Sequence, residues 1–443
     1  MSKLSYTREI PVTTEVDIFI GGGGPAGIVA AIAAARQGAT VCLVDEGSCL
    51  GGMMALGWVP AFSGLSDGVN FMAGGIGKEI YDKLDRMGGI VSYNAVKIEI
   101  LKRIYDDMII KAGVRLLLLT KVIDITLDSS SRLSNVILAS KSGIFSIKAK
   151  IFIDCTGDGE IGAKAGAPFL KGDDYGRMMA ATLCSLWAGI DWDQVYAGGR
   201  IADDTYIEDA YRNGVLPGHD RHLPGMWRIG KNLGGGNIGH LFDVDSTDEE
   251  SLTQALISGR KLVMQYEQYY KTYLKGFKNM ELVGTAPIMG VREGRRFIGD
   301  YILSVDDYVN RASFDDEIGR FAYPIDIHAS NTDAESFREY EKFFIDYRYE
   351  AGENYGIPYR ILTTKGFDNL LVAGRCVSAD RYMMGSLRVT PGCYITGQAA
   401  GIAAALALNA DNDIRAFDIG ELQVRLKDMG AFMPNFKQAA HSL

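Results

Sequence analysis

The chain begins with short apolar runs that alternate with segments rich in glycine and alanine. The runs at residues 18–20 and 40–44 have the length and continuity of parallel strands that are buried on both faces. Between them, residues 25–37 are mostly small and aliphatic, which predicts a helix that lies close to a sheet, and Gly38 suits the position after its C-terminus. The pattern predicts a strand–helix–strand unit over residues 16–45.

Helical and strand-like segments continue through the next hundred residues. Helices are predicted over residues 75–87 and 95–112. Strand-length runs separated by turn residues predict a β-meander and then one more buried strand, at residues 114–120, 133–139, 144–148 and 149–154.

Past residue 172 the chain has more aromatic and charged residues and more loops. Thr247 and Glu250 match a capping box, which predicts a helix from there to about residue 274. A polar helix is predicted over residues 329–351.

The end of the chain returns to the pattern of its start. A buried strand over residues 367–373 precedes a helix of small residues over 393–407. We therefore predict a nucleotide-binding domain built from both ends of the chain, with a substrate or cap domain inserted between them: residues 1–172 and 352–443 form the first, and residues 173–351 the second.

Composition and charge remove several classes of function. Hydrophobic residues make up 47% and charged residues 23% of the 443 residues, as in ordinary globular proteins. The net charge of −9 argues against a nucleic-acid partner. No apolar run has the length of a membrane span, and residues 1–15 lack the apolar core of a signal peptide. We expect a cytoplasmic protein that does not engage a membrane, and the sequence leaves a homo-oligomer open.

Metal binding is not expected. The six cysteines are scattered and form no C-x-x-C pair, which argues against zinc and iron–sulfur sites and suits a reducing compartment. His219, His222 and His240 are close in sequence, but exposed loop histidines are a commoner arrangement than a metal site. Cys393 stands at the start of the predicted C-terminal helix, a position that lowers the pKa of a thiol.

The first turn carries the pattern G-x-G-x-x-G. Gly22 permits a tight turn, Gly24 lets the backbone approach a pyrophosphate, and Gly27 lets helix and strand pack closely. The helix N-terminus attracts phosphates, and Asp45 ends the second strand, where a carboxylate can bind ribose hydroxyls. A purely structural glycine turn is disfavoured because strand, helix and acidic residue all stand in place. The unit predicts a dinucleotide site.

A second glycine pair points to one family. The segment L-G-G-M at residues 50–53 resembles the FAD-binding branch of such proteins, and further segments match in the expected order across the chain. The sequence resembles bacterial FAD-dependent oxidoreductases with a two-dinucleotide-binding-domain flavoprotein fold. It is more distantly similar to fumarate-reductase-type flavoproteins and to the flavin subunit of heterodisulfide reductase, whose cysteine clusters are absent here. The segments are D-C-T-G-D-G (154–159), G-V-R-E-G-R-R (290–296), Y-P-I-D-I-H (323–328), I-P-Y-R (357–360), N-L-L-V-A-G-R-C-V-S (369–378) and G-S-L-R-V-T-P-G-C (385–393).

The resemblance implies an α/β fold, with a Rossmann-like FAD-binding domain of the glutathione-reductase type and an inserted α+β cap. It implies that Asp45 holds the adenosine ribose, that Thr156 to Asp158 lie on the adenosine side, and that the helix end at Pro391 faces the flavin ring. Where many flavoproteins have an acidic residue after Gly374, this chain has Arg375, which we expect on a phosphate or ribityl oxygen. The full implied FAD set is Gly22, Gly24, Pro25, Ala26, Gly27, Asp45, Glu46, Gly52, Met53, Val122, Thr156, Gly157, Asp158, Gly374, Arg375, Pro391 and Gly392.

Three residues are catalytic candidates. His328 is one of only five histidines and suits a proton acceptor, with Asp326 placed to orient its ring, although a structural histidine is the alternative. Arg292 suits an anionic substrate, and a helix would put it on one face with Arg296; the alternative is a salt-bridged helix face. Arg388, just before Pro391, is expected to contact flavin or substrate. Tyr323 and Tyr382 are further phenols, more typical of packing.

We therefore predict an FAD-dependent dehydrogenase. It would move a hydride between a CH–OH or CH–CH group of a small polar substrate and flavin N5. Two alternatives stay open at this point: an electron-transfer flavoprotein subunit that needs a partner, and an enzyme resembling thiazole synthase that holds an NAD-derived ligand.

Overall fold

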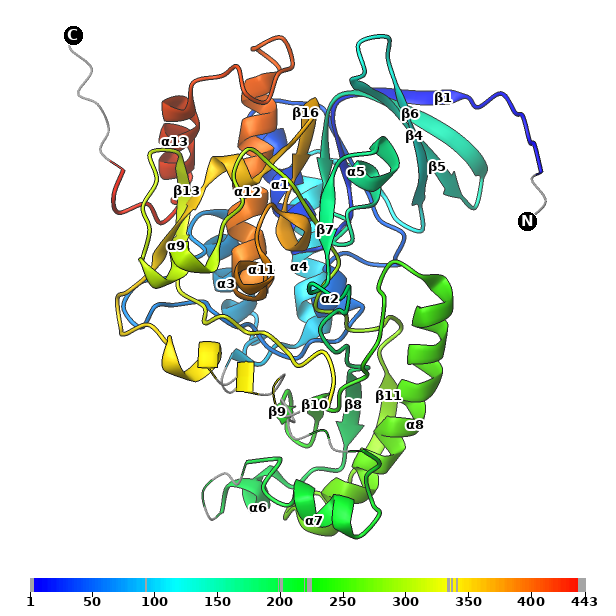
Figure 1. Cartoon of the computed structure of the whole chain (residues 1–443), viewed down its shortest axis with the longest axis vertical. Helices are drawn as coiled ribbons and strands as arrows, with labels where there is room; N and C mark the ends of the chain where they lie inside the picture. Colours follow the sequence, from blue (N-terminus) through cyan, green and yellow to red (C-terminus); the bar gives the residue numbers. More distant parts are fainter. Residues whose placement is uncertain are drawn as a thin grey trace.

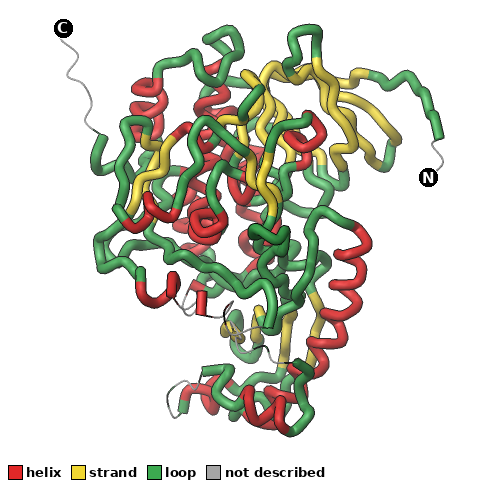
Figure 2. The backbone as a smooth tube through the Cα atoms, in the orientation of Figure 1, coloured by secondary structure: helices red, strands yellow, loops and turns green. Residues whose placement is uncertain are grey.

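The structure is a computed structural model of the whole chain. It describes residues 4–91, 94–197, 199, 202–218, 220, 225–332, 335, 338–339 and 342–436. Figure 1 shows an upper body that contains both ends of the chain and a lower lobe built from its middle. Figure 2 shows that many of the strands gather in one part of the upper body, beside a group of helices.

A mainly parallel sheet runs through the upper body in the order β15, β16, β6, β1, β2, β3. The bounds are β1 Val12–Gly21, β2 Val41–Val44, β3 Arg115–Leu117, β6 Gly143–Asp154, β15 Thr363–Thr364 and β16 Phe367–Val372. β1 pairs in parallel with β2 and β6, and β6 pairs in parallel with β16. The strand near the C-terminus therefore joins the same sheet as the first strand, and the predicted α/β fold is confirmed.

β6 is longer than the pattern suggested. We predicted separate strands at residues 144–148 and 149–154, but one strand spans both. Its first half pairs with β5 (Leu133–Ser140), which pairs with β4 (Lys121–Leu127), and the rest lies beside β1. No turn residue interrupts the chain at Lys148, so the strand continues from the meander into the parallel sheet. The strand predicted at 114–120 covers β3, whereas β4, which follows it directly, was not predicted.

Alternate residues of β1 point to opposite faces of the sheet. Ile18 and Ile20, both fully buried, pack into the main core with the predicted helices on one face. Phe19 lies in a second core on the other face, with residues of the meander such as Val136. The helices of the main core are α1 Pro25–Arg36, α3 Ile76–Arg86, α4 Ile98–Lys111, α12 Thr390–Ala407 and α13 Ile419–Asp428.

α1 and α12 pack in close contact because α12 carries glycine at the crossing points. A Cβ atom on Gly397 would lie 2.2 Å from the carbonyl oxygen of Ala26, and one on Gly401 would lie 2.2 Å from that of Ala30. Both helices advance by four residues between these contacts, so they run in the same direction. Their N-termini therefore lie at the same end.

The close packing gives a stability prediction. We expect Gly401→Ala to lower the free energy of unfolding by about 1–3 kcal/mol, because the added methyl group forces the helices apart. Gly420→Ala in α13 is the matched control, since its nearest atom is the far end of the Asp418 side chain at 3.3 Å. Urea unfolding of both variants checks this; equal stability would contradict the packing argument.

The lower lobe is a four-stranded antiparallel sheet with helices around it (Figure 1). Its elements are β8 Ser185–Ala188, β9 Gly225–Arg228, β10 Gly234–Asn237, β11 Glu281–Thr285, α6 Trp192–Tyr196, α7 Ile207–Arg212 and α8 Glu249–Tyr273. The predicted capping box at Thr247 is wrong: Asp248 is the N-cap and accepts from the Ser251 N–H at 2.7 Å. The carboxylate of Asp248, one residue closer to the first turn, takes the capping role that was expected of the Thr247 hydroxyl.

Other short elements are α2 Gly52–Ala55, α5 Glu160–Ala165, β7 Phe169–Lys171, β12 Arg295–Phe297, α9 Val305–Val309, β13 Glu317–Phe321, β14 Tyr355–Pro358 and α11 Arg381–Leu387. The predicted polar helix at 329–351 is shorter: among the described residues, 335, 338 and 339 are helical and Lys342–Asp346 form a π-helix, whereas 329–332 and 348–350 are not helical.

The predicted domain boundaries stay a prediction. β7 and β12 pair across residue 172, and β13 and β14 pair across residue 351. Ile318 and Phe321 belong to the main core with α1 and α12. The segment that leads out of the lower lobe thus packs on the upper body before β14 begins.

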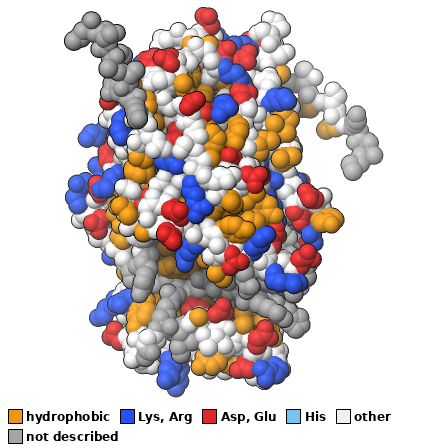
Figure 3. All heavy atoms as spheres, turned by 60° about the vertical axis from the view of Figure 1, so that its left-hand side comes forward, with side chains coloured by type: hydrophobic (Ala, Val, Ile, Leu, Met, Phe, Trp, Pro, Cys, Tyr) orange, Lys and Arg blue, Asp and Glu red, His pale blue; other side chains and the backbone are white. Residues whose placement is uncertain are grey.

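The surface carries mixed charge. On the face drawn in Figure 3, Lys and Arg side chains are interspersed with Asp and Glu. Within the described part of the chain, none of the helices is both long enough and apolar enough to span a bilayer.

Candidate functional site

A cavity of about 1160 Å³ lies where the parallel strands end and the lower lobe meets them. It is lined by the residues that follow β1, β2, β6 and β16, and by residues from the lobe such as Asn237 and Trp227. Of the residues predicted from the sequence, all three catalytic candidates and fourteen of the FAD set line it; Gly27, Pro391 and Gly392 do not. The structure therefore brings residues from five widely separated segments to one cavity.

The glycines of the first turn have distinct structural roles. Gly22 has φ +95°, and a Cβ there would lie 2.3 Å from the Cys155 carbonyl oxygen. A Cβ on Gly27 would lie 1.9 Å from the Gly22 carbonyl oxygen. Gly24 differs, because it has φ −72° and a Cβ would meet nothing closer than Gly52 Cα at 4.0 Å. The first two glycines are required by packing, whereas Gly24 faces open space in the cavity.

The second glycine pair packs over the first turn. Gly51 has φ +115° and donates its N–H to the Gly23 carbonyl oxygen at 2.8 Å. Gly52 has φ +50°, and its Cβ position is only 3.0 Å from Gly24 Cα. Both glycines are thus needed by the turn itself, and they hold α2 against the start of α1.

Asp45 joins the turn to the end of β2. Its carboxylate accepts from the Gly23 N–H and the Gly47 N–H, both at 2.6 Å. Burial raises the pKa of Asp45, against these two hydrogen bonds, which lower it. The carboxylate lines the cavity at the position predicted for the ribose contact; that contact stays a prediction.

Two helix N-termini meet at the cavity. α1 starts beside Gly24, and α12 starts at Thr390, which lines the cavity with Val389 and Cys393. In the described chain, no side chain caps either start. Parallel helices place two positive dipole ends here, which favours an anion. Pro391 and Gly392 form the first turn but are buried behind the lining.

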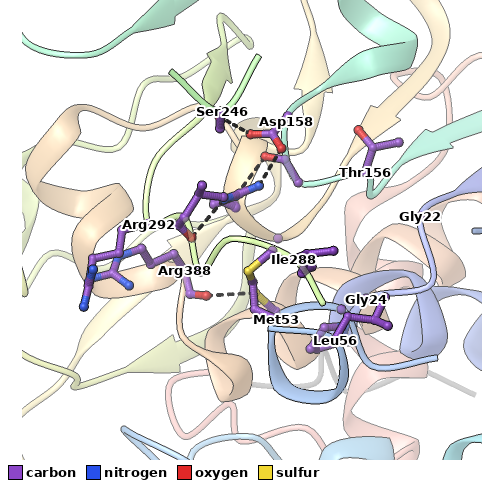
Figure 4. Close-up of a pocket in the computed structure, with 18 of the residues that line it drawn as sticks. Gly22, Gly24, Met53, Leu56, Thr156, Asp158, Ser246, Ile288, Arg292 and Arg388 are labelled. Carbon is purple, nitrogen blue, oxygen red and sulfur yellow. Dashed lines mark hydrogen bonds and ion pairs between the residues drawn. The ribbon is translucent and has the colours of Figure 1, made fainter. Parts of the chain in front are cut away.

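Arg375 makes hydrogen bonds to segments that are far apart in the sequence. It donates to the carbonyl oxygens of Gly157 at 3.1 Å and Val291 at 3.0 Å. It also pairs with Asp158 at 2.9 Å, and Asp158 accepts from Ser246 Oγ at 2.6 Å (Figure 4). Three of its nitrogens are thus directed at the protein, although it lines the cavity, and its contact with a phosphate or ribityl oxygen stays a prediction.

Arg292 is buried in the cavity wall. Its Nη1 donates to the Ala180 carbonyl oxygen at 2.7 Å and to Thr182 Oγ1 at 3.0 Å, and its Nη2 donates to Asn237 Oδ1 at 3.3 Å. Burial, and next the positive charge of Arg388, lower the pKa of Arg292 to about 10. Figure 4 shows Arg292 and Arg388 together at the end of the pocket away from Gly22 and Thr156.

The segment with the three arginines does not form the helix that would have put Arg292 and Arg296 on one face. Residues 291–294 are loop and Arg295 begins β12. Arg296 pairs with Glu293 and donates to the Gly172 carbonyl oxygen, away from the cavity. Arg292 and Arg296 therefore do not share a face.

Arg388 is held by Asp326. Arg388 Nη2 donates to Asp326 Oδ2 at 3.1 Å and to the Asp326 carbonyl oxygen at 3.0 Å, and Tyr323 donates its hydroxyl to the same Oδ2 at 3.3 Å. Burial, the largest single effect, raises the pKa of Asp326, but the contact with His328 and the charges of Arg388 and Arg292 together lower it below its usual value. Residues 322–329, which carry Asp326 and His328, form a loop.

His328 lies in a row of four acidic and imidazole groups. Its Nδ1 lies 2.8 Å from His240 Nε2, and its Nε2 lies 3.3 Å from Asp326 Oδ1. His240 Nδ1 in turn lies 3.0 Å from Asp220 Oδ1. Burial, and next the charge of Arg292, hold the pKa of His328 well below its usual value, while Asp326 raises it. His328 is therefore neutral at pH 7.

The sequence did not indicate His240 as a partner of His328. We grouped it with His219 and His222, which lie outside the described residues. His240 is instead buried, 88 residues from His328 in sequence, and its ring packs edge-on against that of His328. No pattern within either segment marks this contact. Across the described residues, no group of three metal-ligating side chains was found.

Cys393 corrects a further expectation. A helix start was expected to lower its pKa, but burial raises the pKa of the thiol to about 12, against the charges of Arg375 and Arg388. Its Sγ donates to the Arg388 carbonyl oxygen at 3.3 Å. The thiol is thus a packing group. Tyr382 donates to Glu339 at 2.7 Å and does not line the cavity.

The chain is similar in sequence or in structure to several known proteins. Residues 17–426 match the sequence profile of the family described as FAD dependent oxidoreductase. Similar solved structures include a geranylgeranyl bacteriochlorophyll reductase-like protein from Thermoplasma acidophilum (13% identity over 94% of this chain and 84% of that one, TM-score 0.47). Others are the p-nitrophenol 4-monooxygenase PnpA from Pseudomonas putida DLL-E4 (11%, 90% and 79%, TM-score 0.39) and the myxobacterial chondrochloren halogenase CndH (11%, 94% and 78%, TM-score 0.41). Among curated proteins, none matched.

Proposed function

This chain belongs to the FAD dependent oxidoreductase family, and we propose that it transfers a hydride between a small polar substrate and N5 of FAD. The substrate group would be CH–OH or CH–CH. The observation that carries the proposal is the position of His328: its buried imidazole lines the same cavity as the glycine turns, beside Arg388 and the buried Arg292.

The protein is an enzyme and its cofactor is FAD, which sets aside the NAD-derived ligand. The described residues fit this group. Gly24 leaves open space where a pyrophosphate would approach, and the uncapped start of α1 favours its charge. The cavity of about 1160 Å³ exceeds the roughly 300–1,000 Å³ of ordinary ligand sites, so a dinucleotide and a substrate have room together.

FAD, when bound, supplies the hydride acceptor or donor. The side chains of the protein would bind and orient the substrate and transfer the proton. We infer that His328 accepts the proton that leaves the substrate as the hydride is lost, because its lowered pKa keeps it neutral. Its Nδ1 is engaged by His240, so Nε2, beside Asp326, is the nitrogen on which the proton would arrive. Asp326, which is held in place by its ion pair with Arg388, orients the imidazole ring of His328.

An anaerobic screen tests this function. FAD-loaded protein, without any partner, is mixed with sugars, hydroxy acids and enoates, and the absorbance of oxidised FAD is followed. We expect at least one compound with a CH–OH or CH–CH group to bleach it, with free FAD as the control. Bleaching that requires a second protein would instead support an electron-transfer subunit, and bleaching by none of the compounds would contradict the proposal.

A further inference from the structure

The two arginines at the far end of the cavity share a single carboxylate. Asp326 pairs with Arg388 at 3.1 Å and also lies 3.3 Å from His328. Within the described residues, Arg292 has no carboxylate within ion-pair distance, and the partners of its guanidinium are the neutral oxygens of Ala180, Thr182 and Asn237. Buried charges are normally paired, because an unpaired one costs several kcal/mol in low-dielectric surroundings.

Arg388 also has unused hydrogen-bonding capacity. Its Nε is buried and has no hydrogen-bond partner in the described chain. A buried donor without an acceptor costs about 1–3 kcal/mol, and Arg388 lines the cavity with its side chain only 13% exposed. The positive charge of Arg292 and the unused donor of Arg388 therefore lie together in the cavity, next to His328.

We propose that the substrate is a small organic acid whose carboxylate binds at Arg292 and Arg388. This inference rests on the proposed function. A carboxylate accepts charge-assisted hydrogen bonds from guanidinium groups, and it would supply the second negative charge that the pair lacks. The carbon next to it would then lie near His328. The FAD pyrophosphate does not meet this need, because the glycine turn that would hold it lies at the other end of the pocket (Figure 4).

The test compares acids with their neutral amides. FAD-loaded protein is titrated with oxalate and malonate, and with oxamide and malonamide, which have similar shapes without the charge. The readouts are the rise in melting temperature and the change in FAD absorbance, from which Kd follows. We expect the acids to bind and the amides to bind at least about tenfold more weakly. Equal binding of acids and amides would overturn the inference, as would failure of both acids to bind at about 10 mM, tenfold above a Kd of ~1 mM.

Variants then locate the binding site. Arg292→Met should raise the Kd for oxalate at least about tenfold, and Arg292→Lys should restore part of the affinity. Arg360→Met is the matched control: Arg360 is half-exposed, pairs with Asp316 at 3.0 Å and lies outside the cavity lining, so acid binding should not change. If Arg292→Met does not fold, the lysine variant and the acid–amide comparison carry the test. Unchanged acid affinity in Arg292→Met, whether or not FAD is retained, would overturn the inference.

The two proposals can fail separately. If a neutral substrate bleaches FAD and the acids do not bind, hydride transfer stands and the organic acid is wrong. If the acids bind through Arg292 and no compound in the anaerobic screen bleaches FAD, the anion site stands and the hydride-transfer proposal is wrong.

Discussion

Replacing Gly24 with valine yields a folded protein that has lost FAD. The backbone at Gly24 has φ −72° and ψ −179°, which any residue adopts, and a Cβ atom there meets only Gly52 Cα at 4.0 Å. The valine methyl groups would instead occupy the space where the pyrophosphate approaches the start of α1. We expect FAD occupancy near zero after gel filtration, with circular dichroism and melting behaviour close to those of the FAD-free parent.

Gly27→Val is the contrasting variant. A Cβ on Gly27 would lie 1.9 Å from the Gly22 carbonyl oxygen, so this substitution should disrupt folding as well as FAD binding. The pair separates a glycine needed by the cofactor from a glycine needed by the fold. Full FAD occupancy in Gly24→Val would refute the placement of the pyrophosphate.

His328→Gln should slow FAD reduction by about a hundredfold with FAD content unchanged. Loss of a positioned proton acceptor typically costs on the order of 10²–10⁴ in rate. A glutamine amide can keep hydrogen bonds to His240 and Asp326, but it cannot take up a proton. The rate is followed by stopped-flow absorbance with the substrate found in the anaerobic screen, and a variant that reduces at the parent rate would show that His328 is structural.

The pH profile of the same reaction is a second readout. Burial and the charge of Arg292 lower the pKa of His328, against the opposing charge of Asp326, and His240 packs on its other side. The neutral, proton-accepting form therefore persists as the pH falls through 6.5, and the rate should decline only at a lower pH. In His328→Gln this acid limb should disappear.

Local features were predictable because their residues lie close in sequence. The strand, the glycine turn and Asp45 fall within thirty residues, and strand–turn–helix geometry brings them together without help from the rest of the chain. The C-terminal strand and α12 were recognised for the same reason, since their small and apolar residues mark burial directly. The polar residues of the cavity, such as Arg292 and His328, are not marked by any comparable pattern in the sequence.

Contacts between distant segments account for the failures. His240 and His328 meet only because the lower lobe folds back on the segment after β13, and nothing in either segment records the other. The spacing of Arg292 and Arg296 would place both on one face only in a helix, and the loop and β12 that form there direct them apart. At α8, Thr247 and Asp248 both suit an N-cap, and the choice depends on where the preceding turn ends.

The row of Asp220, His240, His328 and Asp326 can form hydrogen bonds only where a hydrogen is available for each contact. It contains three contacts, of 3.0, 2.8 and 3.3 Å, and each becomes a hydrogen bond only if it holds one hydrogen. A neutral His328 brings one hydrogen, but both of its ring nitrogens have a contact. Both contacts can be hydrogen bonds only if a neighbour donates to one of them. The tautomer of the candidate base is therefore set by its neighbours, and one of these is His240, 88 residues away in sequence.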